Sequence, residues 1–119
     1  MKLTEAEWTV MSILWQKERF GLKEIADQLY EINQWNKNTV FTYLTRMEHK
    51  GLVEIDRNQS KPYSAKLSKE QCAKEERQNL LNKVYQGSTG DLIAAFLKES
   101  PISSQEIDRL KQLLDEMEV

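Results

Sequence analysis

The sequence contains very little cysteine, histidine, proline and glycine: one Cys, one His, two Pro and four Gly among 119 residues. Because Cys72 is alone, it cannot form an internal disulfide, which agrees with a reducing compartment. The longest apolar run, Leu92–Leu97, is far shorter than the roughly 20 residues of a membrane-spanning helix. Residues 1–5 contain no apolar signal core and turn acidic at once. We therefore expect a cytoplasmic protein with no membrane segment.

The scarcity of reactive side chains also argues against catalysis. An active site needs a convergent set of acid, base or nucleophile residues, whereas this chain has His49, Cys72 and no glycine-rich phosphate loop. One imidazole and one thiol far apart in the chain are not a metal-binding cluster. We expect no enzyme activity, no metal site and no cofactor.

The charges present are unevenly distributed. The whole chain has a net charge of −2, and its 39% hydrophobic and 30% charged residues are typical of a globular protein. Residues 35–66 contain six basic and three acidic side chains, a net +3, whereas residues 68–119 contain seven basic and ten acidic ones, a net −3. The basic middle could face phosphates, although the weak overall charge predicts modest nonspecific affinity for nucleic acid.

Hydrophobic periodicity predicts three helices in the first half of the chain, at residues 3–16, from Leu22 to about Ile32, and from Asn36 or Lys37 to a stop at Gly51. Thr4 and Glu7 form a capping-box pattern at the first start. The second helix is expected to place Ile25, Ala26, Leu29 and Tyr30 on one side. The third is expected to turn Val40, Phe41, Leu44 and Met47 inward, with Thr39, Thr42, Thr45 and Arg46 largely on the other side.

Two short strands are predicted next, at residues 52–56 and 63–67, joined by the polar loop 57–62. Residues 19–21 could supply a small additional strand. Three more helices are predicted, from Ser68 to about Gln86, at 91–98 and at 104–117; Ser68 is the N-cap candidate of the first of these, with Gln71 in the capping-box position. This order predicts a mainly α fold with a small β-sheet: a winged helix-turn-helix domain at residues 1–67, with 57–62 as the wing, followed by a helical dimerisation region at 68–119.

The third helix carries side chains suited to DNA. Its threonines, asparagines and arginine can donate to phosphates and reach base edges in the major groove. Each has an ordinary alternative: a polar helix face is often only solvated, Trp35 at the helix entrance is more often a packing aromatic, and Arg57 and Lys61 could be plain hairpin charges. The order of elements favours the DNA-binding interpretation.

The helices after residue 68 carry more apolar positions than short surface helices need. A single winged module reads only one half-site, and two-fold pairing would supply a second. We therefore assign dimerisation to the apolar positions there; the alternative is that they complete one monomeric core. The predicted dimerisation residues are Leu80, Leu81, Val84, Leu92, Ile93, Phe96, Leu97, Ile107, Leu110 and Leu114.

Two segments resemble a known family. Residues 3–15, LTEAEWTVMSILW, are similar to the opening helix of the BlaI/MecI/CopY repressors, and residues 35–40, WNKNTV, with Arg46, Lys50 and Gly51, are similar to their recognition helix. The similarity continues through the wing to Phe96-Leu97 and the final helix at 106–108. The resemblance implies a dimeric winged-helix repressor that binds an inverted-repeat operator and controls β-lactam resistance or copper export. The DNA-binding residues it implies, with those above, are Trp35, Asn36, Lys37, Asn38, Thr39, Thr42, Arg46, Lys50, Arg57 and Lys61.

The sequence departs from that family at three points. The copper-responsive branch ends in paired Cys-x-Cys elements, whereas this chain has only Cys72. At Asn38 the β-lactam repressors usually carry lysine, so the operator can differ. Those repressors are inactivated by cleavage of an Asn-Phe bond, and here the matching bond is Ala95-Phe96. The resemblance thus implies a sensor protease as a partner, with a changed cleavage sequence.

Two other functions compete with the repressor hypothesis. A winged helix can serve only as a protein-protein interaction module, in which case the third helix and the wing would be indifferent to DNA and salt. A repressor could instead sense a small ligand, but no polar cluster among the apolar positions of the tail indicates such a site.

Overall fold

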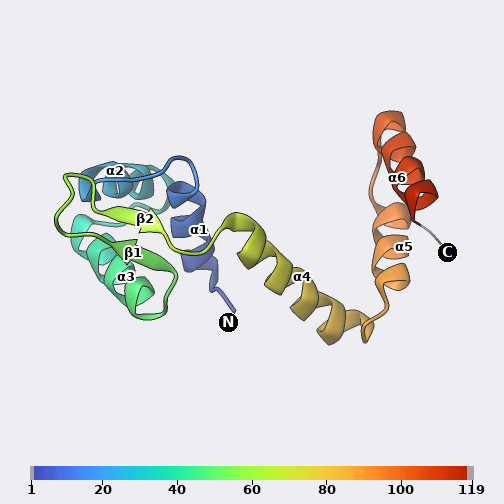
Figure 1. Cartoon of the computed structure of the whole chain (residues 1–119), viewed down its shortest axis with the longest axis horizontal. Coiled ribbons are helices and arrows are strands. Elements are labelled where there is room, and N and C mark those ends of the chain that lie inside the picture. Colours follow the sequence, from blue (N-terminus) through green and yellow to red (C-terminus); the bar gives the residue numbers. More distant parts are fainter. Residues whose placement is uncertain (1, 118–119) are drawn as a thin grey trace. The chain divides into compact units, whose positions relative to one another are not determined.

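The computed structural model describes residues 2–117, which contain six helices and one two-stranded antiparallel sheet (Figure 1). The elements are α1 (Glu5–Leu14), α2 (Leu22–Asn33), α3 (Lys37–His49), β1 (Val53–Ile55), β2 (Tyr63–Ala65), α4 (Lys69–Tyr85), α5 (Thr89–Glu99) and α6 (Ser104–Glu116). This confirms the predicted fold class. The chain divides into two compact units, one ending at Arg77 and one beginning at Gln78; the predicted division at residues 67 and 68 stays a prediction. No helix within residues 2–117 has the length and apolarity required to cross a membrane.

Both predicted capping boxes are present. At the start of α1 the Thr4 amide donates to Glu7 Oε1 (2.9 Å) and the Glu7 amide donates to Thr4 Oγ (3.2 Å). Before α4 the Ser68 amide donates to Gln71 Oε1 (2.7 Å), and the Gln71 amide donates to Ser68 Oγ (3.1 Å). These bonds satisfy amides that have no partner in the first turn of a helix.

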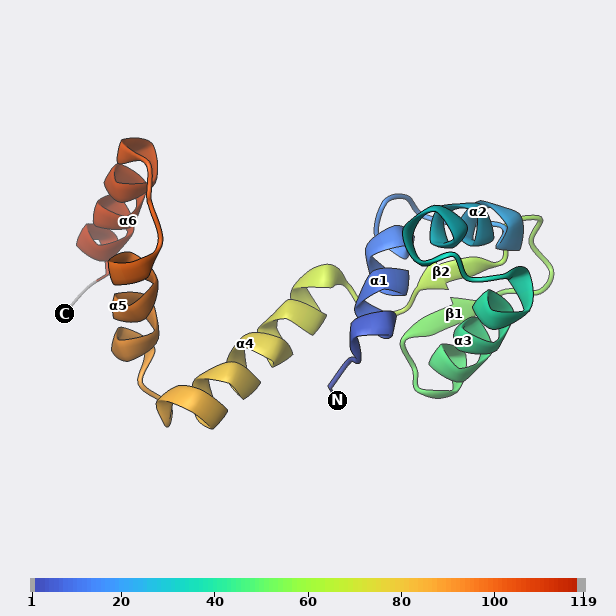
Figure 2. The same ribbon diagram turned by 180° about the vertical axis from the view of Figure 1, so that it is seen from behind.

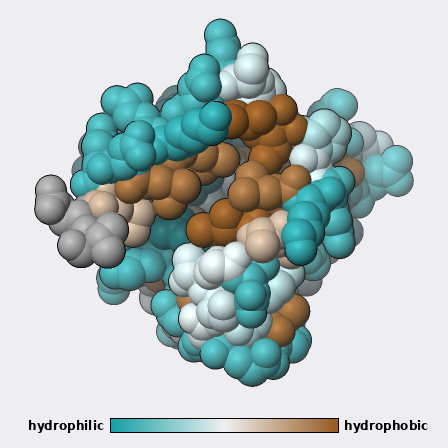
Figure 3. Space-filling view, turned by 90° about the vertical axis from the view of Figure 1, so that its right-hand side faces the viewer, coloured by the Kyte–Doolittle hydropathy of each residue, from teal (hydrophilic) through white to brown (hydrophobic). Residues whose placement is uncertain are grey.

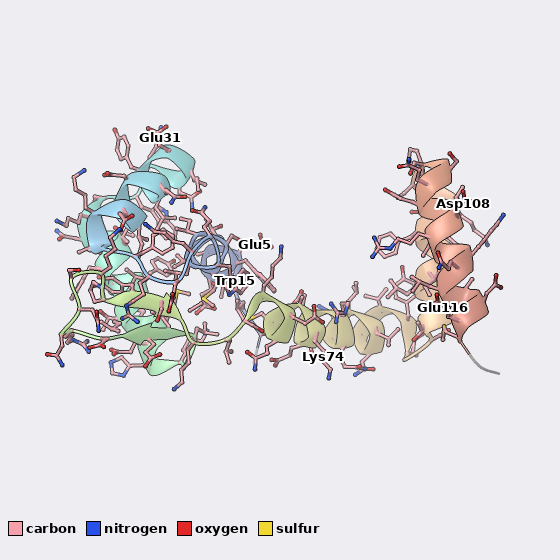
Figure 4. The ribbon with its side chains drawn as sticks, turned by 45° about the horizontal axis from the view of Figure 1, so that its top comes forward. Glu5, Trp15, Glu31, Lys74, Asp108 and Glu116 are labelled. Carbon is pink, nitrogen blue, oxygen red and sulfur yellow. The ribbon has the colours of Figure 1, made fainter. Side chains whose placement is uncertain are left out.

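The three N-terminal helices and the sheet surround one core in the first unit (Figure 2). Phe20 pairs with Tyr63 through two backbone hydrogen bonds of 2.8 and 3.0 Å, so the predicted small strand at residues 19–21 is a single bridge beside β2. Trp15, at the end of α1, donates its indole N–H to the Leu67 carbonyl oxygen (3.0 Å), which ties that end to the chain just before α4 (Figure 4). The fully buried side chains at the centre are Val10, Met11, Ile13, Leu14, Phe20, Ile25, Leu29, Val40, Leu44, Met47, Leu52 and Val53.

Helix α3 is fixed at both ends. Asn36 accepts a hydrogen bond from the Thr39 amide (2.9 Å) as the N-cap, and Gly51 adopts φ +80°, a conformation that side chains rarely tolerate, directly after the helix. Strand β1 follows and pairs antiparallel with β2, Val53 opposite Ala65 and Ile55 opposite Tyr63. The loop between these strands is the predicted wing.

Two residues of the predicted apolar faces, Phe41 and Tyr30, are largely exposed to solvent. Phe41 is 51% exposed and Tyr30 is 63% exposed. In α3 the buried arc is centred on Val40, Leu44 and Met47, and Phe41 lies about 100° away from Val40 around the helix axis. Tyr30 likewise follows the buried Leu29 and falls outside the arc that faces the core. The sequence pattern overestimated the width of both apolar faces.

The second unit differs from the first in that its helices α5 and α6 contain no buried residue among the described residues. Gln86 and Gly87 take positive φ angles of 45° and 84° after α4, and α5 and α6 follow with serine N-caps at Ser88 and Ser103. Figure 3 shows apolar side chains gathered over these two helices and bordered by hydrophilic ones. In the second unit as a whole, including the end of α4, the large exposed apolar residues are Leu80, Val84, Ile93, Phe96, Leu97, Ile107, Leu110, Leu113, Leu114 and Met117.

The placement of Phe41 can be checked by paired truncations in α3. Leu44→Ala removes a fully buried side chain and should lower the free energy of unfolding by about 2–5 kcal/mol. Phe41→Ala should lower it by less than about 1 kcal/mol, because much of the ring is already in water. Urea unfolding followed by circular dichroism measures both. Equal losses would show that Phe41 belongs to the core.

Candidate nucleic-acid interface

Five of the ten predicted DNA-binding residues come together on the outer face of α3. Asn36, Asn38, Thr42 and Arg46 are exposed, Thr39 is half-buried, and together with Tyr43 they line one shallow concavity. The Thr42 hydroxyl donates to the Asn38 carbonyl oxygen (3.0 Å), so its lone pairs remain available to accept. The arrangement presents donors and acceptors along about two helical turns, which is the length that a recognition helix offers to base edges.

Trp35 packs at the entrance of this helix. Its ring is half-buried and stacks on Tyr43, with ring centroids 4.5 Å apart and an interplanar angle of 12°. The contact holds the segment before α3 against the second turn of the helix. Trp35 therefore has a packing role, and a direct contact with DNA stays a prediction.

Lys37 and Arg46 are the cations that the interface leaves free. Both are exposed, and neither forms an ion pair or a side-chain hydrogen bond with any residue between 2 and 117. An unpaired guanidinium on this face can bond bidentately to a guanine edge or to a phosphate. An unpaired ammonium near the helix start suits a phosphate.

Lys50, by contrast, is engaged inside the unit. Its ammonium donates to both carboxylate oxygens of Glu7, at 2.8 and 2.6 Å, and Glu7 is only 5% exposed. Burial alone would raise the pKa of Glu7, but the Lys50 ammonium and the Thr4 amide outweigh burial and hold that pKa below its usual range. The pair joins the start of α1 to the end of α3, and a role for Lys50 on DNA stays a prediction.

The wing cations are also paired. Both terminal nitrogens of Arg57 donate to the Glu48 carboxylate, at 3.1 and 3.2 Å, and the Lys61 ammonium lies 3.3 Å from Glu24 Oε1. Arg57 holds the pKa of Glu48 below its usual range. The Gly21 amide, with Lys17 next in effect, lowers the pKa of Glu24 to about 2.

The wing is additionally fixed through its backbone. The Arg19 guanidinium donates to the Lys61 and Pro62 carbonyl oxygens, at 2.8 and 3.0 Å. The Asp56 amide donates to the Pro62 carbonyl oxygen at 2.8 Å and closes the loop at its base. The wing is therefore tied to the segment before α2 as well as to α3.

Sequence reasoning did not identify Glu7, Glu24 and Glu48 as partners of the predicted DNA-binding cations. The spacing of Glu7 from Thr4 signalled its cap, but Lys50 is 43 residues away in the chain, so only the fold brings the two together. Phe41 was missed as an exposed residue. It lies on the same side of α3 as Glu48, seven residues on, and an exposed aromatic ring there can contact a thymine methyl group.

No three His, Cys, Asp or Glu side chains come together as a metal-binding group in the part of the chain between residues 2 and 117.

Known proteins resemble this chain over nearly its whole length. Residues 3–116 match the family described as "Penicillinase repressor". The methicillin resistance regulatory protein MecI of Staphylococcus aureus strain N315 is 27% identical over 115 residues, which cover 96% of this chain and 94% of the relative. The penicillinase repressors of Staphylococcus aureus and Bacillus licheniformis are 25% and 24% identical, covering 98% and 97% of this chain and 94% and 91% of the relatives.

The Glu7–Lys50 pair makes stability depend on pH. Because the folded-state pKa of Glu7 is lowered, its contribution is present above the usual value of 4.5 and is lost as pH falls through the folded-state pKa. Glu7→Gln should lower the free energy of unfolding by about 1–3 kcal/mol at pH 7 and flatten its decline below pH 4.5 relative to the unchanged chain. Urea titrations between pH 3 and 7 measure this.

The control for that experiment is Asp27→Asn, which removes the exposed pair with Lys23 (2.8 Å) on the surface of α2. This variant should leave stability at pH 7 unchanged, because exposed pairs contribute little. If Glu7→Gln behaves like the control, the pair does not stabilise the fold.

Proposed function

The chain belongs to the penicillinase repressor family, and from that premise we propose that it represses transcription as a dimer bound to an inverted-repeat DNA operator. The observation that carries the proposal is the outer face of α3. There an unpaired Arg46 and Lys37 lie beside the polar side chains of a helix in a winged helix-turn-helix frame.

In the proposed complex α3 enters the major groove. Arg46, Thr39 and Thr42 reach base edges, while Lys37 and the amides at the start of the helix contact phosphate. Asn36 has its side-chain oxygen committed to the N-cap, so its amide group is the part left for DNA. The wing lies over the adjacent backbone and orients the helix.

Dimerisation is proposed for the second unit. Eight of the ten predicted dimerisation residues are exposed there, and Leu81 and Leu92 are half-buried. Apolar side chains gathered on two consecutive helices with no cover of their own mark an association surface. A second copy of the chain is the partner that a palindromic operator requires, because the two-fold axis of the DNA then matches that of the protein.

Relief of repression is proposed to come from proteolysis at Ala95-Phe96. The bond lies within α5, where Ala95 is half-buried and Phe96 is exposed, and no residue of this helix is buried. A helix without buried residues unwinds at low cost, which is what a protease needs to bind an extended segment. Cleavage would remove the end of α5 and all of α6, and with them part of the proposed dimer surface. The partner would be a sensor protease.

The DNA-binding function is tested with Arg46→Ala. Fluorescence anisotropy would measure binding to a duplex carrying a family-like inverted repeat and to a scrambled duplex, across a salt series. The variant should lose about 10- to 100-fold in affinity for the repeat, because a bidentate base contact typically contributes that much discrimination. Arg77→Ala, which changes an arginine paired with Glu70 on α4, is the matched control and should bind as the unchanged chain does.

Two outcomes would oppose the proposal. Unchanged affinity in Arg46→Ala would remove α3 from the recognition role. Equal, weak binding of the unchanged chain to both duplexes, with no preferred sequence after selection from random DNA, would favour the protein-protein interaction module.

The dimer is tested with Leu110→Asp, which places a charge on the exposed apolar face of α6. The dimer dissociation constant should rise at least tenfold in sedimentation equilibrium, because a buried unpaired carboxylate is costly at an interface. Gln105→Asp on the same helix adds the same group at an exposed polar position and serves as the control. An unchanged sedimentation profile of Leu110→Asp would place the dimer surface elsewhere.

A further inference from the structure

The contact between Arg57 and Glu48 joins the wing to the recognition helix. Both terminal nitrogens of the guanidinium face the two carboxylate oxygens, at 3.1 and 3.2 Å, in the bidentate geometry that arginine also uses for phosphate. The Arg57 side chain is 67% exposed and the Glu48 side chain 28% exposed, so the pair lies at the surface. The cation that the wing would offer to DNA already has a complete anionic partner.

A DNA phosphate and Glu48 require the same two N–H donors. The edge of the guanidinium that carries the two terminal nitrogens bonds one bidentate partner at a time. A phosphate can therefore replace the Glu48 carboxylate on that edge, but the two cannot occupy it together. A glutamate carboxyl is already ionised at neutral pH, and Arg57 lowers the pKa of Glu48 further. The competition therefore persists throughout the physiological range.

Two of the other four cations that were predicted to contact DNA are also paired with carboxylates, so each free cation counts for more. Lys61, the second cation of the wing, is held by Glu24, and Lys50 is held by Glu7. Of the five cations predicted to contact DNA, only Lys37 and Arg46 are unpaired among residues 2–117. Freeing Arg57 would add a third unpaired cation, a large change for an interface that has only two.

We propose that Glu48 is a positioning residue that competes with the DNA backbone for Arg57 and thereby restrains the binding of the wing to any duplex. The proposal rests on the proposed function, since it assumes that α3 and the wing face DNA. It differs from a plain repulsion between Glu48 and phosphate because the effect runs through Arg57. It also differs from a purely structural role, in which the Arg57–Glu48 pair holds the wing in place and loss of Glu48 would weaken DNA binding.

The test is a double-mutant cycle with Glu48→Gln, Arg57→Gln and the double variant. Binding is measured by anisotropy in the intact chain, on a scrambled 30-base-pair duplex and on a duplex selected from random DNA by the unchanged protein, between about 50 and 300 mM salt. Glu48→Gln should bind the scrambled duplex about two- to fivefold more tightly. Its slope of log affinity against log salt should steepen by about 0.9, the value for one added phosphate contact.

In the Arg57→Gln background the Glu48→Gln change should have no further effect on affinity or slope. The control for the change in net charge is Glu70→Gln, which breaks the 2.8 Å pair with Arg77 on α4. Its effects on affinity and on the salt slope should both be smaller than those of Glu48→Gln. An equal gain in the presence and absence of Arg57 would mean simple repulsion and would overturn the proposal. Weaker binding by Glu48→Gln would mean that the pair orders the wing, which also overturns it.

Failure of the proposed function would look different. It would appear in the unchanged chain, as the absence of salt-dependent binding to either duplex or of any selected sequence. The proposal about Glu48 fails instead when the unchanged chain binds DNA normally and the cycle shows no coupling between Glu48 and Arg57.

Discussion

The nearly buried carboxylate of Glu7 joins two helices of the first unit. It closes the capping box with Thr4 and accepts two hydrogen bonds from Lys50, so one nearly buried side chain fixes both the start of α1 and the end of α3. The core alone would allow α3 to rotate or slide slightly, because apolar contacts are not directional. A charged hydrogen bond at the end of the helix is directional, and it sets where the outer face of α3 points.

Carboxylate–cation pairs also occur on the wing, and in the proposed complex they would limit how strongly the wing attracts DNA. Glu24 and Glu48 hold Lys61 and Arg57, so carboxylates at the ends of α2 and α3 secure the loop while neutralising its cations. An interface with few free charges gains little from phosphate contacts, and more of its affinity must come from base edges. Internal ion pairing thus favours selectivity in the proposed complex over indiscriminate binding, in keeping with the net charge of −2.

Much of the fold could be predicted from the sequence because its signals are local. Helix ends are marked by residues within four positions of one another: Thr4 with Glu7, Ser68 with Gln71, and Gly51. The third helix and the loop between the two strands also lie where the sequence predicts them. Phe41 was misplaced because it lies at the edge of an apolar arc, where periodicity cannot separate a buried residue from an exposed one. The partners of Lys50 and Arg57 were not predictable, since those contacts depend on how distant segments pack.

The small number of free cations also explains why dimerisation through the C-terminal helices would be needed for tight binding to DNA. One module with Arg46 and Lys37 available can make few strong contacts, so its residence on a single half-site would be short. When two modules are joined, binding of the second module to its half-site becomes intramolecular and takes place at a high effective concentration. The affinity for the whole operator then rises without any new contact. The reverse also holds: cutting α5 at Ala95-Phe96 would return each module to its weak single-site affinity while leaving every DNA-facing side chain intact. A protein that binds weakly alone is therefore easily switched off by loss of its partner.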